Sequence, residues 1–254
     1  MINLNAIYVM WLRELKKFTR MKSRIIGTLA MPLFFLAFMG MGFNRSAMPG
    51  IPQGVKYISY LVPGILGMSL LFSSMFAGLS VLWDREFGFL KEIMVAPVSR
   101  VSIVLGRIAG GITTGIIQAL MVILISFVAG FRITSAPMFI VAFVFLILIA
   151  STFIGLGLVF ASNMKDMQGF QLIMNFVIFP LFFLSGALFP LANLPAWIRV
   201  ISHLDPLTYG IDGLRGTLIG VSVLPVSVDL LAMVLFSLLM VFLGAWFFEK
   251  SESV

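Results

Sequence analysis

The sequence predicts an all-α integral membrane protein with six transmembrane helices. Hydrophobic residues make up 61% of the 254-residue chain, whereas charged residues make up only 11%. The mean hydropathy is +1.12. A soluble globule of this size needs much more polar surface than such a composition provides. The charged residues are also placed so that several long stretches carry none, which is typical of membrane-spanning segments.

Six apolar stretches are long enough to cross a bilayer. A helix rises about 1.5 Å per residue and the hydrocarbon core is about 30 Å thick, so roughly 20 apolar residues are required. The predicted six-span transmembrane domain, residues 25–254, has spans at about 25–43, 57–83, 101–131, 133–164, 167–189 and 230–248. An even number of spans places both termini on the same side of the membrane.

The distribution of basic residues predicts which side that is. If the N-terminus is cytoplasmic, the cytoplasmic side carries 12 of the 17 lysines and arginines, and the other side carries five: Arg45, Lys56, Arg132, Arg199 and Arg215. The positive-inside rule therefore places both termini in the cytoplasm of a multi-pass inner-membrane protein. The net charge of +7 is spread between apolar spans, where it suits anionic lipid rather than nucleic acid. A cleaved signal peptide fits residues 1–45 poorly, because the charged region is long and the apolar core already reaches spanning length.

The first 24 residues predict an amphipathic helix on the inner leaflet. Apolar residues recur at helical spacing, while cations form a stripe with the same period: Leu4, Ile7, Trp11, Leu15 and Phe18 against Arg13, Lys16, Lys17, Arg20 and Arg24. We expect the apolar edge to enter the acyl chains and the cations to meet lipid phosphates. An ordinary positive-inside anchor fits this pattern as well as a dedicated mechanical lever does.

The spans carry little chemistry of their own. Their interiors lack Asp, Glu, Lys and His, and Arg107 lies close enough to the cytoplasmic edge to snorkel, so coupling to an ion gradient is disfavoured. Zero cysteines and one histidine predict no metal site.

An enzymatic function is likewise disfavoured. No Gly-Lys-Ser or Gly-Lys-Thr occurs, so a phosphate-binding P-loop is excluded. The glycine-rich run 110–115 lacks that lysine and predicts close helix packing instead. For a serine paired with a base, Ser185 and His203 are the available candidates, and His203 is expected on the polar side of a short interfacial helix.

Residues 84–100, between the second and third spans, form the charged segment most suited to a soluble partner. Two adjacent spans need only a few residues to turn, yet about 17 intervene here, alternating apolar and charged side chains. The pattern predicts a short helix along the inner face, closed by Pro97. Periodicity alone fits a solvated loop with a lipid-touching helix equally well.

Before the last span, residues 190–220 predict two short helices on the outer side. Pro180, Pro190 and Pro195 break or kink any helix that enters them. Asp205-Pro206 is typical of an N-cap followed by proline at the first helical position. We expect helices at about 195–204 and 206–219, too short to cross, at the outer interface or re-entrant. Asp212 and Arg215 lie one turn apart and can form an ion pair.

Two of these segments resemble a known family, the type 2 permeases of ATP-binding-cassette (ABC) exporters. The run 84–100, with Arg85-Glu86, Gly88 and the closing Pro97-Val98-Ser99-Arg100, resembles that family's signature after the second span. Leu188-Phe189-Pro190, residues 203–209 and residues 212–215 resemble its segment before the last span. The resemblance covers the whole chain, and both multidrug-type and lipid or saccharide exporters are within its range.

The resemblance implies a mechanism and partners. Segment 84–100 would be a coupling helix that docks on a separate ATPase subunit, through Asp84, Arg85, Glu86, Phe87, Gly88, Leu90, Lys91, Glu92 and Pro97. Two ATPase copies, which bind ATP and Mg²⁺, would serve a permease homodimer, while this chain itself would hold no cofactor. The outer hairpin would close the path with structural residues Pro190, Pro195, Asp205, Pro206, Asp212 and Arg215.

The substrate path has a weaker candidate. Phe176, Phe179 and Phe183 share one face of the fifth span, with Asn175 beside them. Such a stripe more often packs or faces lipid than binds a ligand. If it lines the path, it suits an amphiphilic drug, lipid or glycan-type substrate. The alternative function is a self-contained channel or facilitator with a regulatory cytoplasmic loop.

Overall fold

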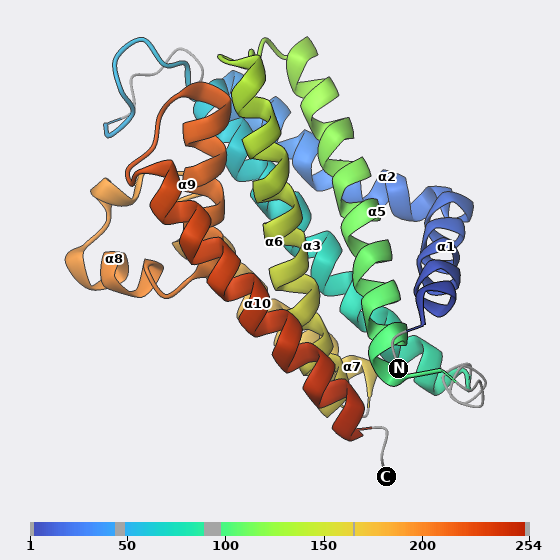
Figure 1. The fold of residues 1–254 in the computed structure, drawn as a ribbon. Coiled ribbons are helices and arrows are strands. Elements are labelled where there is room, and N and C mark those ends of the chain that lie inside the picture. Colours follow the sequence, from blue (N-terminus) through green and yellow to red (C-terminus); the bar gives the residue numbers. More distant parts are fainter. Residues whose placement is uncertain (1–2, 44–48, 89–97, 165, 252–254) are drawn as a thin grey trace.

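The computed structural model describes residues 3–43, 49–88, 98–164 and 166–251, and these form helices and loops without a strand. Figure 1 shows the long helices leaning against one another as a tilted bundle. In chain order the elements are α1 Leu4–Arg20, α2 Lys22–Phe35, the π-helix η1 Leu36–Gly40, α3 Tyr57–Glu86, α5 Arg100–Val128, α6 Ala136–Asn163, α7 Met167–Leu184, the 3₁₀-helix η2 Leu191–Asn193, α8 Ala196–Ser202, α9 Pro206–Ile219 and α10 Val226–Ser251.

Five of the six predicted spans are confirmed as long apolar helices. These are α3, α5, α6, α7 and α10. The helix in the first predicted span, Ile25–Gly40, is shorter than predicted. It reaches spanning length only when it is counted together with α1, and the two helices are bent by 70° relative to each other. α7 runs through Pro180 and ends at Leu184, short of the predicted Phe189.

The core is centred on α3. In the most apolar 18-residue stretch of α3, 78% of the residues are buried, compared with 22% for the same length of α7 and 17% for that of α10. Glycines bring the backbones of the central helices together: a Cβ on Gly78 of α3 would lie 2.5 Å from the carbonyl carbon of Gly157 in α6. A Cβ on Gly155 would similarly lie 2.5 Å from the backbone of Met240 in α10. α6 is therefore packed tightly between α3 and α10.

α1 is helical as predicted, and much of its apolar face packs against α5, whereas Leu4 at its start is 76% exposed. Trp11 donates its indole N–H to Thr113 Oγ1 of α5 at 3.0 Å, and Phe18 is only 5% exposed. The fit depends on glycine, because a Cβ on Gly106 would lie 2.5 Å from Met10 Cβ. The predicted packing role of the glycine run is thus confirmed, since Gly110 meets α1 and Gly111 meets Ile154 of α6.

The two short helices of the outer hairpin match the predicted pair. α8 covers 196–202 and α9 covers 206–219. Asp205 caps α9 as expected, because its Oδ1 accepts a hydrogen bond from Leu207 N at 2.9 Å. α8 is largely exposed, with Trp197 65% exposed, whereas most residues of α9 are buried. The hairpin is therefore anchored in the bundle through α9.

Candidate functional site

Near the end of α3, one carboxylate joins three helices. Asp84 is 3% exposed. Its two oxygens accept hydrogen bonds from Arg13 of α1, with Nη1–Oδ2 at 2.9 Å and Nη2–Oδ1 at 2.7 Å. Arg107 of α5 donates from Nη2 to Oδ2 at 2.6 Å. We call Arg13, Asp84 and Arg107 the Asp84 cluster; it fixes α1, α3 and α5 to each other where segment 84–100 begins.

The Asp84 cluster contradicts the expectation for Arg107 and contains a buried ion pair that the sequence did not predict. Arg107 was expected to snorkel to the membrane edge, but it is 4% exposed and directed at Asp84. Its Nε and Nη1 have no hydrogen-bond partner among the described residues, so Asp84 is its compensating charge. A lone arginine inside an apolar span signals a need for a buried partner. The sequence could not identify that partner, because Asp84 lies in another helix.

The predicted partner-binding residues fall into three groups. The polar contacts of Asp84 are made within the chain, as described above, and Arg85 Nη1 donates to Met164 O at 3.1 Å, which ties the end of α3 to the end of α6. Glu86 is exposed, Phe87 is 73% exposed, and Gly88 has φ +77°, a left-handed conformation that favours glycine. The remaining residues, Leu90, Lys91, Glu92 and Pro97, lie outside the described residues, so a coupling helix there stays a prediction.

An apolar groove of about 590 Å³ lies between α2 and α3. Its wall includes Met31, Met68, Phe72 and Phe76. The predicted aromatic stripe of α7 reaches this wall at one point, where Phe179 meets Phe72 with ring centroids 5.8 Å apart.

The rest of the stripe stays on the outside of α7. Phe183 stacks on Phe179 with 6.5 Å between ring centroids and is 59% exposed. Phe176 is 80% exposed, and Asn175 is also exposed. Their place in a substrate path stays a prediction.

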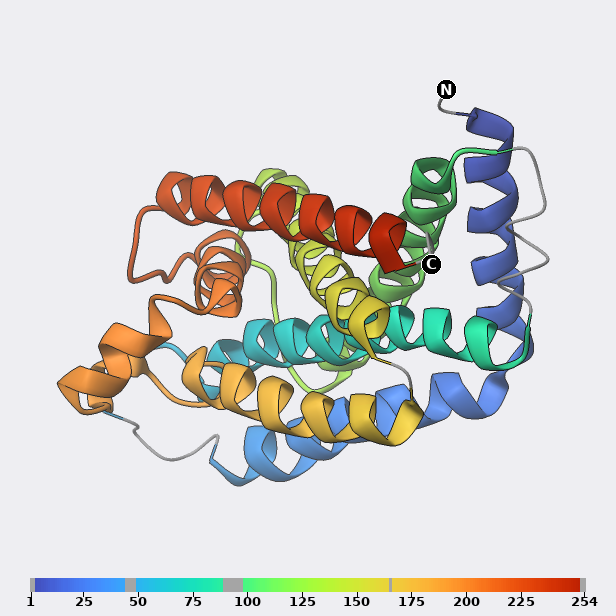
Figure 2. The same cartoon turned by 90° about the horizontal axis from the view of Figure 1, so that it is seen from below.

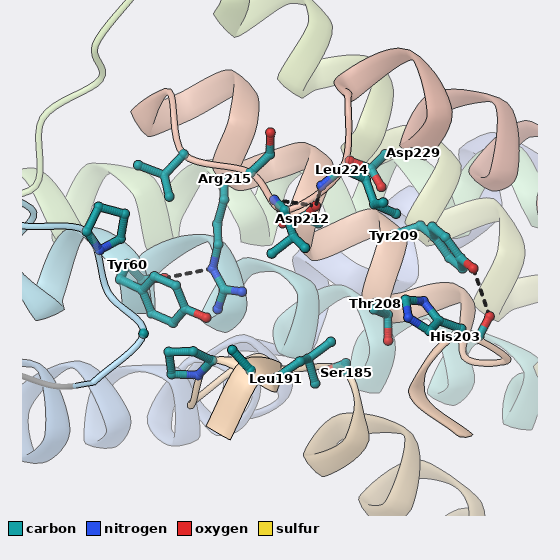
Figure 3. Close-up of a pocket in the computed structure, with 17 residues that line it drawn as sticks. Tyr60, Ser185, Leu191, His203, Thr208, Tyr209, Asp212, Arg215, Leu224 and Asp229 are labelled. Atoms are coloured by element: carbon teal, nitrogen blue, oxygen red, sulfur yellow. Dashed lines mark hydrogen bonds between the residues drawn. The ribbon is translucent and has the colours of Figure 1, made fainter. Parts of the chain in front are cut away.

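At the other end of the bundle, the outer hairpin encloses a cavity of about 220 Å³ (Figure 3). Arg215 of α9 is one of the residues that line this cavity. Its Nη2 donates to the carbonyls of Gly186 and Ala187 at 2.7 and 3.0 Å, and its Nε donates to Tyr60 O at 3.3 Å. The guanidinium also lies 3.6 Å from the Tyr60 ring centroid. Arg215 therefore satisfies the carbonyls left open where the chain turns after α7.

The expected ion pair between Asp212 and Arg215 is wrong. Asp212 instead accepts backbone N–H groups of the loop before α10, from Val223 at 2.9 Å and Leu224 at 2.8 Å. Both side chains serve backbone groups that would otherwise be unpaired: Asp212 those of the loop after α9, and Arg215 those of the turn after α7. The remaining predicted hairpin residues occupy boundaries: Pro190 and Pro195 precede η2 and α8, and Pro206 begins α9.

Asp205 of the hairpin has an unusual electrostatic environment. It is 3% exposed, and its Oδ2 has no hydrogen-bond partner among the described residues. Burial raises the pKa of Asp205 to about 8, although the hydrogen bond from Leu207 N opposes this rise. Ser185 and His203 both line the outer cavity, but Ser185 Oγ donates to Phe182 O.

Comparison with known proteins places this architecture in a family. Residues 5–219 match the model of the ABC-2 type transporter family. The chain is similar to the inner membrane transport permease YadH of Escherichia coli, at 28% identity over 246 residues that cover 95% of this chain and 91% of YadH. It is also similar to the putative transport permease ycf38 of Cyanophora paradoxa, at 28% identity over 84% of this chain and 73% of that protein.

A third relative, nodulation protein J of Sinorhizobium fredii, is 25% identical over 89% of this chain and 86% of its own. The family match extends from α1 through the end of α9, and so includes the Asp84 cluster and the outer hairpin. The chain is a membrane transport permease and belongs to the ABC-2 type transporter family.

Proposed function

We propose that this permease is the membrane subunit of an ATP-driven exporter in the inner membrane, and that segment 84–100 receives the motion of a separate ATPase subunit. The observation that carries the proposal is the Asp84 cluster. It ties α1, α3 and α5 together at the root of that segment. A force applied there would move three helices as a unit rather than bend a single helix end.

The surface next to the cluster suits a soluble partner. Glu86 and Phe87 project from the end of α3, one charged and one aromatic. Exposed aromatic residues beside charged ones are common in protein interfaces. With no P-loop in this chain, ATP and Mg²⁺ would be bound by the partner, in two copies for a permease dimer. The N-terminus and C-terminus would both face the cytoplasm.

The substrate proposal is an amphiphilic molecule moved outward. The groove between α2 and α3 is walled mainly by methionine, phenylalanine and proline, with Thr28, Ser69 and Ser73 among the polar members. Methionine is flexible and adapts to irregular apolar shapes. Such a wall suits a drug, lipid or lipid-linked glycan better than a small ion.

The proposal is tested by co-purifying the permease with its ATPase and reconstituting the pair in liposomes. We expect Glu86→Ala to leave membrane insertion normal but to reduce ATP-driven substrate export by roughly tenfold, the effect of losing one charged hydrogen bond of about 1.5–3 kcal/mol at the contact. Gly88→Pro should act similarly, because proline cannot adopt the positive φ of Gly88.

Glu249→Ala is the matched control, since Glu249 is an exposed glutamate near the end of α10. It should export at the normal rate. Normal export by both Glu86→Ala and Gly88→Pro would contradict the coupling assignment. Equally fast substrate movement by the permease alone, without ATPase or nucleotide, would favour the channel or facilitator instead.

A further inference from the structure

The charges on α1 are unevenly distributed. The helix has one acid, Glu14, and it lies against α5, where a Cβ on Gly110 would be 2.6 Å from Glu14 Cβ. Arg13 lies beside it, with Nη1 3.9 Å from Glu14 Oε1, and the cations continue from Arg13 along the face away from α5. There they line a groove of about 520 Å³, formed by Val9, Leu12, Arg13, Lys16, Lys17, Arg20 and Met21. None of the residues in this lining is acidic, so the groove is a concentrated positive surface.

Two of these cations are not used by the fold. Arg13 is held by Asp84, and Lys17 lies over the ring of Trp83 at 5.4 Å. Lys16 and Arg20 are both exposed, and within the described residues no hydrogen bond or ion pair engages either side chain. Like charges one helical turn apart destabilise a helix. An anion bound between Lys16 and Arg20 would reverse that effect.

The groove also has an apolar part and a suitable position. Val9, Leu12 and Met21 line it together with the cations, and Val9 is 60% exposed. α1 is bent by 70° from the apolar helix that follows it. Figure 2 shows α1, in dark blue, running crosswise to α2 and α3 at one end of the bundle. A helix in that position lies near the level of lipid headgroups, with cations and apolar side chains presented together.

We propose that this groove binds the phosphate headgroup of an anionic phospholipid, held mainly by Lys16 and Arg20, with Val9, Leu12 and Met21 against its glycerol and upper acyl region. The inference is independent of the ATPase partner. It assigns the outward face of α1 to a lipid, while the inward face serves the packing on α5. A soluble acidic protein would match the charge but would leave the apolar side chains of the groove without a lipid to contact.

The test measures lipid bound to the purified full-length protein in detergent by native mass spectrometry, with phosphatidylglycerol and phosphatidylcholine as probes. Each basic residue contributes about 1 kcal/mol to attraction toward anionic lipid. We therefore expect Lys16→Gln/Arg20→Gln to bind phosphatidylglycerol roughly 30-fold more weakly, with phosphatidylcholine binding unchanged. Lys56→Gln/Arg132→Gln removes the same charge from exposed positions elsewhere and should bind phosphatidylglycerol as the wild type does.

Three results would overturn the proposal. One is equal phosphatidylglycerol binding by wild type and Lys16→Gln/Arg20→Gln. Another is displacement of the lipid by millimolar inorganic phosphate, which would identify the site as a simple anion site without a lipid component. The third is loss of ATPase capture by the same variant with lipid binding intact, which would identify the groove as a protein contact.

Discussion

At the scale of single residues, this protein buries charge where helices must be held together. Asp84 serves two arginines from different helices, and Arg215 serves three backbone carbonyls. Neither arrangement could be predicted from the sequence. The predicted pairing of Asp212 with Arg215 rested on helical spacing alone. In the structure both side chains instead form hydrogen bonds with backbone groups, Asp212 with Leu224 N and Arg215 with Gly186 O.

Removing the carboxylate of the Asp84 cluster should destabilise the protein strongly. In Asp84→Ala, Arg107 would remain buried without a compensating charge, and breaking a buried pair in this way costs about 3–5 kcal/mol. We expect a clear drop in the thermal unfolding temperature in detergent. Glu86 lies two residues further along α3 and is exposed, so Glu86→Ala should change the unfolding temperature little.

The cluster also predicts a rescue. Adding Arg107→Met to Asp84→Ala removes the orphaned charge and replaces it with an apolar side chain of similar length. The double variant should therefore be more stable than Asp84→Ala alone. If both variants unfold at the same temperature, the two residues are not energetically coupled and the cluster is incidental.

Asp205 predicts a pH dependence of stability. Burial raises the pKa of Asp205 to about 8 in the folded state, against an ordinary value of 3.8. Between these values the folded protein holds a proton that the unfolded chain has released, so the contribution to stability is full below about 4 and is lost as pH rises through 8. Asp205→Asn keeps the cap but cannot ionise. The unfolding temperature of the wild type should fall more between pH 5 and 8.5 than that of Asp205→Asn; parallel curves would contradict the assignment.

At the scale of elements, the helices could be predicted from the sequence, whereas the contacts between them could not. Charge-free length identified the spans, and the Asp205-Pro206 cap placed the start of α9 correctly. The amphipathic pattern of residues 4–20 likewise predicts the helix α1. Its apolar face could serve lipid or protein equally well by periodicity, and the choice is made by Gly106 and Gly110 on α5, which lie about 100 residues away along the chain.

The docking of α1 on α5 can be tested with cysteine cross-linking. The chain contains no cysteine, so a pair introduced at positions 3 and 102, where Asn3 N lies 2.9 Å from Ser102 Oγ, can be cross-linked by a short bifunctional thiol reagent or directly as a disulfide without a competing thiol. Gly106→Leu should reduce the yield of this cross-link, because any side chain there meets Met10 Cβ and Ile7 O. Gly27→Leu is the control, since a Cβ on Gly27 meets nothing within 4 Å. Equal yields in both variants would show that α1 does not depend on the glycine contact.

At the scale of the whole molecule, the two outer faces of the bundle differ in chemistry. Figure 2 shows α2 and α7 together on one side and α10 on the other. On α2, η1 and α7 the exposed large side chains include Phe34, Phe38, Phe176 and Phe183. α10 exposes leucines at 231, 235, 238 and 239, and has exposed aromatic residues, Phe242 and Trp246, only nearer its end. Aromatic residues are favoured in protein interfaces. Leucine gains little from leaving lipid, because lipid tails are as apolar as leucine itself.

This difference predicts the contact in a permease dimer. A single cysteine at Phe183 should form a cross-link between two copies in native membranes, because the α2–α7 side would face the partner and the apolar groove would lie near the contact. A cysteine at Leu238, which is 65% exposed on α10, should remain uncross-linked, because in this arrangement that face would meet lipid. The reverse pattern would move the dimer contact to α10, and would also place the groove on the lipid side of the assembly, where it could not form part of a path between two copies.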